Sequence, residues 1–239
     1  MYHQVGRFDA PSRHRACYCD VDRFGRQMSY LKRFGYRVLD LDEALRALYG
    51  ATALPRRSVV LTFDDGYRNF REQAFPILQR FGFPATVYLV SGLLGKRAEW
   101  LYVVHPKPPL MDAGEIRELH RKGIRFGAHG VTHARLTRLD PAAAREEIFA
   151  SRRRLEDLLG ETVEHFCYPY GDYDEETRRL VRLAGYRSAL TCIRGAANEA
   201  DNPLEIPRKA ISYGDSLLGY AWKLHMKHSR KAAPRTAAS

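Results

Sequence analysis

Short, largely apolar runs alternate with amphipathic helical segments along most of this chain. The strand-like runs cover residues 58–63, 84–90, 124–128, 165–168 and 186–192. Helical patterns separate them over residues 67–81, 112–122, 140–160 and 174–183. Such alternation predicts an α/β fold built on a parallel sheet. Spacing alone leaves open whether this sheet is doubly wound or closed into a barrel.

The amino-terminal part adds two predicted helices in front of this pattern. Asp20 is placed to cap a helix whose apolar face is Phe24, Met28 and Leu31 and which Gly35 ends. A second, short helix is predicted over residues 41–49. Residues 93–110 carry three prolines and no clear period, so we expect a long loop that covers a site.

Two adjacent carboxylates, Asp64 and Asp65, follow the apolar run 58–63 directly, and Gly66 marks a strand-to-loop turn. His129 and His133 form a His-x-x-x-His pair at the end of the strand predicted over 124–128. Two imidazoles and one carboxylate are a common ligand set for catalytic zinc, because they leave a coordination position open for water. A second carboxylate then remains free to act as a base.

Composition sets broad limits on the kind of protein. At 239 residues with 45% hydrophobic residues, the chain is long enough to bury a core without disulfides, and no run of residues has the length and apolarity of a membrane span. Cysteine is sparse, and we expect Cys17, Cys19, Cys167 and Cys192 to be reduced thiols. The residues after Met1 lack the pattern of a secretory signal, so we expect a cytoplasmic protein.

The positive charge is concentrated at the carboxyl end. The net charge is +11, and no acidic residue follows Asp215, whereas five basic residues do: Lys223, Lys227, Arg230, Lys231 and Arg235. Apolar residues lie among them, so this end could contact an anionic membrane at its inner face, or it could be a packed helix with a disordered end. No specific nucleic acid is expected, because no aromatic-interleaved basic motif or helix-turn-helix signature is present.

The motifs together resemble one known family. Thr62-Phe63-Asp64-Asp65-Gly66, then His129-Gly130-Val131-Thr132-His133 and Tyr168-Pro169-Tyr170-Gly171 look like the successive motifs of the NodB-homology polysaccharide deacetylases, carbohydrate esterase family 4. The resemblance covers roughly residues 55 to 210. It implies a distorted (β/α)7 barrel over residues 1–215, with 216–239 as a terminal helix and basic tail.

The resemblance also implies roles for individual residues. Asp64 would be the general base, while Asp65, His129 and His133 would bind Zn²⁺ or another divalent metal such as Co²⁺ or Ni²⁺. Tyr168 and Tyr170 would shape the groove, with a backbone N–H beside the tyrosine at the oxyanion. The arginine that usually precedes this Pro-Tyr pair by two positions, and that pairs with the base, is absent. Arg208 is a candidate for that charge, and a solvated surface arginine is the alternative.

The catalytic acid departs furthest from the common family order. A Leu-x-His motif near the carboxyl terminus usually supplies it, and here only Lys223-Leu224-His225 fits. Tyr2-His3 instead resembles the start of a permuted subgroup that includes the poly-N-acetylglucosamine deacetylases. We therefore expect His3 to be the acid, on the opposite side of the metal from Asp64, with His225 as the alternative.

The function implied is a metal-dependent hydrolase that removes an acetyl group from an N-acetylated sugar of a polysaccharide or of a lipid-linked glycan precursor. Two alternatives remain: a catalytically silent carbohydrate-binding protein on the same fold, and a hydrolase of another amide. The intact set of Asp64, Asp65, His129 and His133 speaks against a silent binder, which has no need of a complete metal set.

Overall fold

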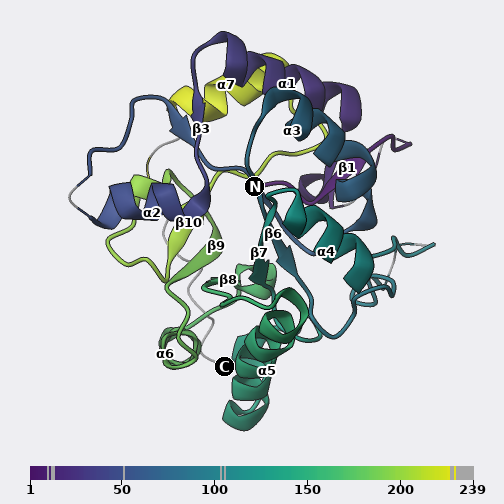
Figure 1. Ribbon diagram of the computed structural model, residues 1–239, viewed down its shortest axis with the longest axis vertical. Coiled ribbons are helices and arrows are strands. Elements are labelled where there is room, and N and C mark those ends of the chain that lie inside the picture. The colour runs from purple at the N-terminus through teal and green to yellow at the C-terminus, as the bar shows by residue number, and fades with distance from the viewer. Residues whose placement is uncertain are drawn as a thin grey trace.

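The alternating strands form one parallel sheet that curls into a distorted barrel (Figure 1). The computed structural model describes residues 1–9, 11, 14–50, 52–102, 104, 106–226 and 229. Six strands run in the order β10-β9-β8-β7-β6-β5, and every neighbouring pair is parallel. Their bounds are Thr62–Phe63 (β5), Thr86–Leu89 (β6), Arg125–Ala128 (β7), His165–Cys167 (β8), Ser188–Arg194 (β9) and Ile206–Arg208 (β10). The predicted barrel fold is confirmed.

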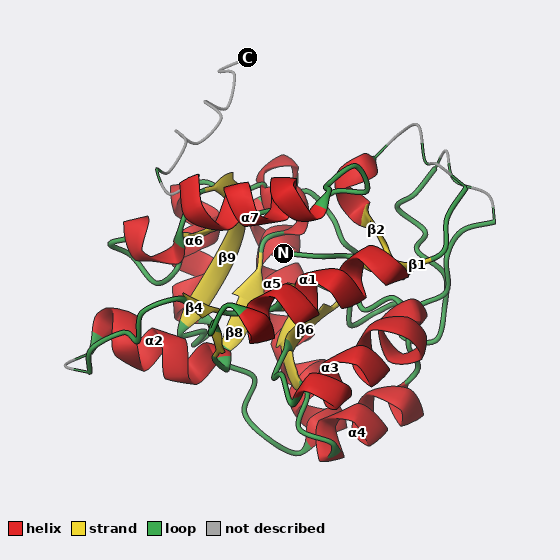
Figure 2. Ribbon diagram, turned by 90° about the horizontal axis from the view of Figure 1, so that it is seen from above, coloured by secondary structure: helices red, strands yellow, loops and turns green. Residues whose placement is uncertain are grey.

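Helices cover the outside of the curled sheet (Figure 2). Their bounds are Val21–Arg33 (α1), Leu41–Tyr49 (α2), Phe75–Phe81 (α3), Ala113–Arg121 (α4), Pro141–Leu159 (α5), Glu175–Leu183 (α6) and Leu217–Met226 (α7). Two further pairs of short parallel strands flank the sheet: β1 (Gln4–Gly6) with β2 (Tyr18–Asp20), and β3 (Arg37–Val38) with β4 (Ser58–Val59).

The helix signals of the sequence are confirmed where capping residues mark them. The Asp20 side chain accepts from the N–H groups of Asp22 and Arg23, and Phe24, Met28 and Leu31 of α1 are fully buried. Asp140 caps α5 in the same way, with Pro141 in the first turn, where a missing N–H costs nothing.

Two predicted elements are each divided in the structure. The run 58–63 is not one strand, since β4 pairs with β3 and only β5 joins the main sheet. The helix predicted over 67–81 begins as a π-helical stretch, Phe70–Ala74, before α3. Pro76 explains this division, because a proline within a helix has no N–H to donate and shifts the hydrogen-bonding pattern of the preceding turn.

The amino-terminal residues lie in the seam of the barrel between β5 and the chain after β10. The Tyr2 N–H donates to the Thr62 carbonyl at 2.8 Å, and the Asp64 N–H donates to the Tyr2 carbonyl at 3.0 Å. On the other side, the Ile211 N–H donates to the Met1 carbonyl at 3.0 Å. The Tyr2 ring is buried, stacks on Phe63 and donates its hydroxyl to Gln27. This segment therefore closes the barrel beside the carboxyl end of β5.

The connection between β6 and α4 is a long loop, as predicted for residues 93–110, of which 103 and 105 lie outside the described part. An isolated bridge pairs Arg97 with Pro109, and Trp100 packs with Tyr67 and Val90 in a small apolar cluster. Among the described residues, no helix has both the length and the apolar character needed to span a bilayer.

Candidate metal and catalytic site

The carboxyl ends of the parallel strands bring the predicted site residues together at one rim of the barrel. Asp64 and Asp65 follow β5, His129 follows β7, and Tyr168 follows β8. Arg208 ends β10 at the far edge of the sheet. Polar side chains that end parallel strands meet at one edge, where barrel enzymes build their sites.

Asp65, His129 and His133 converge on one point. Oδ1 of Asp65 lies 3.3 Å from Nε2 of His129 and 3.2 Å from Nε2 of His133. All three side chains are buried, with exposed fractions of 6% or less. Burial would raise the pKa of Asp65, but the two imidazoles beside it outweigh that effect and hold the pKa well below its usual range.

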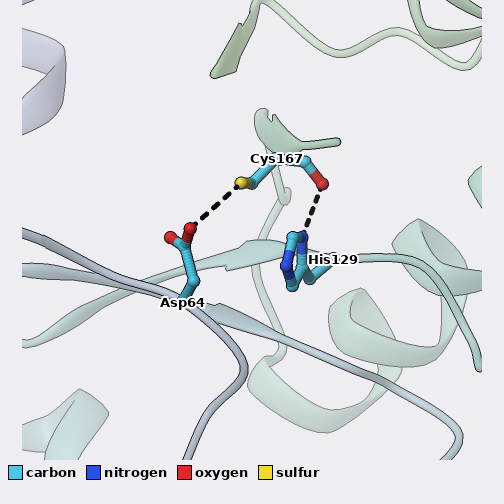
Figure 3. Close-up of side chains that lie close together, drawn as sticks. All are labelled: Asp64, His129 and Cys167. Atoms are coloured by element: carbon cyan, nitrogen blue, oxygen red, sulfur yellow. Dashed lines mark hydrogen bonds between the residues drawn. The ribbon is translucent and has the colours of Figure 1, made fainter. Parts of the chain in front are cut away.

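A hydrogen bond on the ring nitrogen that lies away from Asp65 fixes the orientation of His129. Its Nδ1 lies 2.7 Å from the carbonyl oxygen of Cys167, as the dashed line in Figure 3 shows. Since a carbonyl can only accept, Nδ1 carries a proton, and Nε2 is the ring atom that lies toward Asp65 and would bind a cation. A hydrogen bond of this kind behind a ligating histidine is a recurring feature of metal sites.

These three residues fit a divalent cation. Oδ1 of Asp65 is buried and has no hydrogen-bond partner among the described residues, although Nε2 of His129 lies 3.3 Å away. With the His129 ring neutral and its proton on Nδ1, both Nε2 and Oδ1 are acceptors, and a cation between them would satisfy both atoms. Zinc bound tetrahedrally at ~2.0–2.1 Å would separate its ligand atoms by ~3.3 Å, which matches the distances found.

Asp64 points away from that cluster and pairs with Arg208. The guanidinium binds both carboxylate oxygens at 2.7 Å, and its Nη1 also lies 3.2 Å from the Thr62 hydroxyl. Burial would raise the pKa of Asp64, but the charge and hydrogen bonds of Arg208 lower it to about 2. The structure thus places Arg208, 7% exposed, in the interior and not at a solvated surface.

Cys167 occupies the position nearest to the missing family arginine. Its Sγ lies 3.7 Å from Oδ2 of Asp64, the contact that a dashed line marks in Figure 3. The same Sγ lies 3.1 Å from Nη2 of Arg208. Asp64, His129 and Cys167 could be seen as a second ligand set, since their donor atoms lie within 4.8 Å of one another. The guanidinium already provides the positive charge there, and Nδ1 of His129 is protonated, so a second cation does not fit.

The structure places His3 within the site. Nε2 of His3 lies 3.9 Å from Oδ2 of Asp64, and the side chain is 13% exposed. This position corrects one expectation, because His3 lies beside Asp64 and not across the site from it. The register of Tyr2 against β5 is the cause, since residue 3 then lies next to residue 64.

His225, the alternative acid, lies outside the site. Its Nε2 is 3.1 Å from the hydroxyls of both Tyr30 and Tyr36, where α7 packs near α1. The Leu-x-His motif therefore belongs to a contact between packed helices. The alternative hypothesis, that His225 is the catalytic acid, is wrong because His225 does not lie in the site.

The two tyrosines of the Tyr168-Pro169-Tyr170 segment have different environments. Tyr168 is fully buried, its hydroxyl donates to the Leu204 carbonyl, and its N–H donates to the Leu190 carbonyl. Both donors are thus used inside the fold, which corrects the expectation that Tyr168 shapes the substrate groove. Tyr170 does face the site: its ring lies 4.5 Å from the ring of His133, and it is 40% exposed.

Glu147 of α5 is a site residue that the sequence motifs did not reveal. Its Oε2 accepts from the N–H groups of Val131 and Thr132 at 2.8 and 3.0 Å, and its Oε1 accepts from the Thr132 hydroxyl at 2.7 Å. Gly130 has a φ of 77°, and a Cβ there would come within 2.9 Å of Oε2. Glu147 therefore fixes the turn between the two histidines. The only sequence signal was an acidic residue on the inner face of α5.

Backbone strain is concentrated at this site. Asp65, His133 and Tyr170 have φ values of 77°, 65° and 60°, in the left-handed region that non-glycine residues seldom adopt. The turn at Asp65 directs its carboxylate away from that of Asp64, which separates the metal ligand from the arginine-bound carboxylate. Residues held in this way cost ~1–3 kcal/mol each and are typical of functional sites.

Comparison with known proteins agrees with this geometry. The sequence profile described as polysaccharide deacetylase matches residues 51–189, which is more than half of the chain. The chain belongs to the polysaccharide deacetylase family. All the metal-site residues and Asp64 fall within the matched region, whereas His3 and Arg208 lie outside it.

Curated relatives from Escherichia coli and Staphylococcus aureus carry the name poly-β-1,6-N-acetyl-D-glucosamine N-deacetylase. The Escherichia coli K12 protein is 30% identical over 232 residues, which cover 83% of this chain and 34% of the relative. The Staphylococcus aureus (strain MSSA476) protein is 24% identical over 201 residues, covering 80% and 66%. The chain thus spans between about a third and two thirds of the length of these relatives.

Solved structures show the same fold over nearly the whole chain. The Streptococcus pyogenes deacetylase PplD in complex with acetate is 26% identical, with a TM-score of 0.80 over 93% of this chain and 95% of that one. IcaB from Ammonifex degensii is 23% identical, with a TM-score of 0.77 over 93% and 97%.

Proposed function

We propose that this chain is a metal-dependent carbohydrate N-deacetylase that hydrolyses the acetamide of an N-acetylated sugar in a polysaccharide. The observation that carries the proposal is the convergence of Asp65, His129 and His133 beside an ionised carboxylate, Asp64. The names of the E. coli and S. aureus relatives support a β-1,6-linked N-acetylglucosamine polymer as the first substrate to test. A lipid-linked precursor of such a glycan is the second.

Asp65, His129 and His133 would hold the cation, with Zn²⁺ as the first choice and Co²⁺ or Ni²⁺ as replacements. A divalent cation held there supplies Lewis acidity, which polarises the acetyl oxygen and acidifies an attacking water. The protein itself supplies orientation and proton transfer. The Tyr170 N–H is the candidate donor for the oxyanion, because the next two N–H groups, of Gly171 and Asp172, are bound to the carbonyls of Tyr168 and Pro169.

Asp64 and His3 would move the proton. Arg208 keeps Asp64 ionised at neutral pH, so the carboxylate is always able to accept a proton, although its low pKa makes it a weak base. His3 lies 3.9 Å from the carboxylate, close enough for a small side-chain movement to form a hydrogen bond. In our proposal the proton taken by Asp64 passes to His3, and His3 gives it to the departing amine.

The test is acetate release from N-acetylglucosamine oligomers and from lipid-linked sugars. Activity should disappear with a chelator and return with added Zn²⁺. Asp64→Asn should keep the metal, as measured by elemental analysis, yet lose at least ~10²-fold in turnover, as expected when a positioned base is removed. His133→Ala should lose both metal and activity.

The same assay decides between the alternatives. Oligomer binding without acetate release, unaffected by the chelator, would identify a silent carbohydrate-binding protein. Release of acid from small amides but not from sugars would identify a hydrolase of another amide.

A further inference from the structure

Helix α7 has apolar side chains on two opposite faces. The inner face packs on the barrel: Tyr220 is 3% exposed, and Leu224 contacts the main core. Lys223 fixes this face, since its Nζ donates to Asp215 and to the Ala210 carbonyl. The outer face carries Leu218, Trp222 and Met226, one helical turn apart, with exposed fractions of 83%, 53% and 66%. We call these three residues the α7 stripe.

A stripe of three large apolar side chains in water is costly, and such patches usually mark interaction surfaces. Packing on the barrel does not explain the stripe, because the opposite face of the helix does that packing. A surface helix of this length normally has a polar outer face. The stripe therefore indicates a partner that accepts apolar side chains.

Basic residues lie near the start of α7. Arg23 and Arg26 of α1, together with Ser216 and Leu217 at the start of α7, line a cavity of about 280 Å³. The Arg23 guanidinium already donates to the Tyr213 carbonyl, so Arg26 is the cation that this cavity offers to a phosphate. Arg26 is exposed, and Figure 1 shows α1 and α7 lying next to one another. The chain beyond α7 adds Lys227, Arg230, Lys231 and Arg235, which lie outside the described residues and enter the argument only through their charge.

We propose that the α7 stripe docks on an anionic lipid membrane, with Leu218, Trp222 and Met226 in the acyl boundary and the neighbouring cations at the phosphates. Exposed leucine and tryptophan on one helical face with cations beside them are typical of interfacial helices. Charge argues against a second copy of this chain as the partner, because each copy carries +11. Nucleic acid would match the positive charge, but its phosphate backbone offers no surface on which the apolar side chains of the α7 stripe could be buried.

The experiment measures sedimentation of the full chain with vesicles of phosphatidylcholine alone and of phosphatidylcholine mixed with phosphatidylglycerol. Binding should require the anionic lipid and should weaken as salt rises. Leu218→Ser and Trp222→Ser should each lower the partition coefficient by about tenfold or more, as expected when one large apolar side chain no longer inserts. Trp222 fluorescence should shift to the blue when the mixed vesicles are added.

Matched controls separate the stripe from general apolarity and charge. Leu183→Ser changes a leucine that is 56% exposed on α6, and it should leave binding unchanged. Arg26→Gln should weaken binding to the mixed vesicles, whereas Arg117→Gln, at an exposed position of α4, should not.

Several results would overturn the proposal. They are equal binding to both kinds of vesicle, no binding at all, or binding that the stripe variants leave intact. Concentration-dependent dimerisation in sedimentation velocity, abolished by Leu218→Ser, would show that a second copy covers the stripe instead.

Discussion

At the scale of single residues, the site separates two neighbouring carboxylates by their surroundings. Asp64 faces a guanidinium and Asp65 faces two imidazoles, although they are adjacent in the chain. The left-handed backbone at Asp65 makes this separation possible. Sequence motifs identified both residues, but only the structure shows which charge each one meets.

Glu147 gives the first prediction. Glu147→Gln removes the negative charge from this side chain, so the charge-assisted hydrogen bonds that hold the Val131–Thr132 turn become weaker. The two histidines should then be less well oriented, and Zn²⁺ affinity should fall by about 10- to 100-fold, as for other residues that orient ligands. Competition with a chelating dye measures this directly.

Glu146→Gln is the matched control, because Glu146 is the exposed neighbour on the same helix. It should leave Zn²⁺ affinity unchanged. Wild-type affinity in Glu147→Gln would show that the turn keeps its shape without this carboxylate.

His3 gives the second prediction, which concerns proton delivery. His3→Ala should keep Zn²⁺ and fold but lower turnover on an N-acetyl substrate, because the departing amine would no longer receive a proton. An activated ester, whose leaving group needs no proton, should be hydrolysed at close to the wild-type rate. His225→Ala should leave both substrates unaffected, since His225 contacts Tyr30 and Tyr36. Equal losses on amide and ester would remove His3 from the role of acid.

At the scale of elements, the sequence predicted helix bounds well where capping residues and prolines mark them. Helices with an aspartate cap, such as α1 and α5, were predicted closely. The division of the run 58–63 between two sheets was not, because strand pairing is a tertiary contact that apolar periodicity does not encode. The sequence could suggest Arg208 as the partner of Asp64 only through its charge, because no local sequence signal shows that β10 lies near β5.

Arg208 gives the third prediction, about the contact between β10 and β5. Arg208→Met leaves the Asp64 carboxylate buried without its partner, which should lower the free energy of unfolding by about 3–5 kcal/mol. Urea denaturation measures the change. Adding Asp64→Asn to this variant should restore much of the loss, because no buried charge remains.

Arg179→Met is the control for this pair. Arg179 binds Glu176 on the surface of α6, with side chains 58% and 48% exposed, so its loss should leave the free energy of unfolding nearly unchanged. A similar cost for both arginine variants would mean that the Arg208 pair is as weak as a surface pair.

At the scale of the whole molecule, metal binding should couple to stability. A cation that binds only the folded chain stabilises it by about 2.7 kcal/mol at a hundredfold excess over its Kd. Zn²⁺ should therefore raise the Tm by several degrees, and His133→Ala should abolish the increase. Differential scanning calorimetry with and without a chelator checks this.

His165→Asn serves as the reference for that measurement. His165 forms a further cluster with Asp42 and Glu164, away from the rim, but Arg187 already pairs with both carboxylates there. The Zn²⁺-induced increase should persist in this variant. If His165→Asn abolished the Zn²⁺-induced increase in Tm and His133→Ala kept it, the metal site would lie at the amino end of β8, next to His165.

The seam that Met1–His3 fills has a consequence for how such enzymes are recognised. Which side chains are neighbours at the rim depends on their positions around the barrel and not on their order along the chain. A histidine from the amino terminus and an arginine from the last strand stand next to the same aspartate, although 61 and 144 positions separate them from it. Any strand end facing this aspartate could hold either group. We therefore expect that comparing the spatial positions of rim residues would group enzymes whose motifs occur in a different order in their sequences.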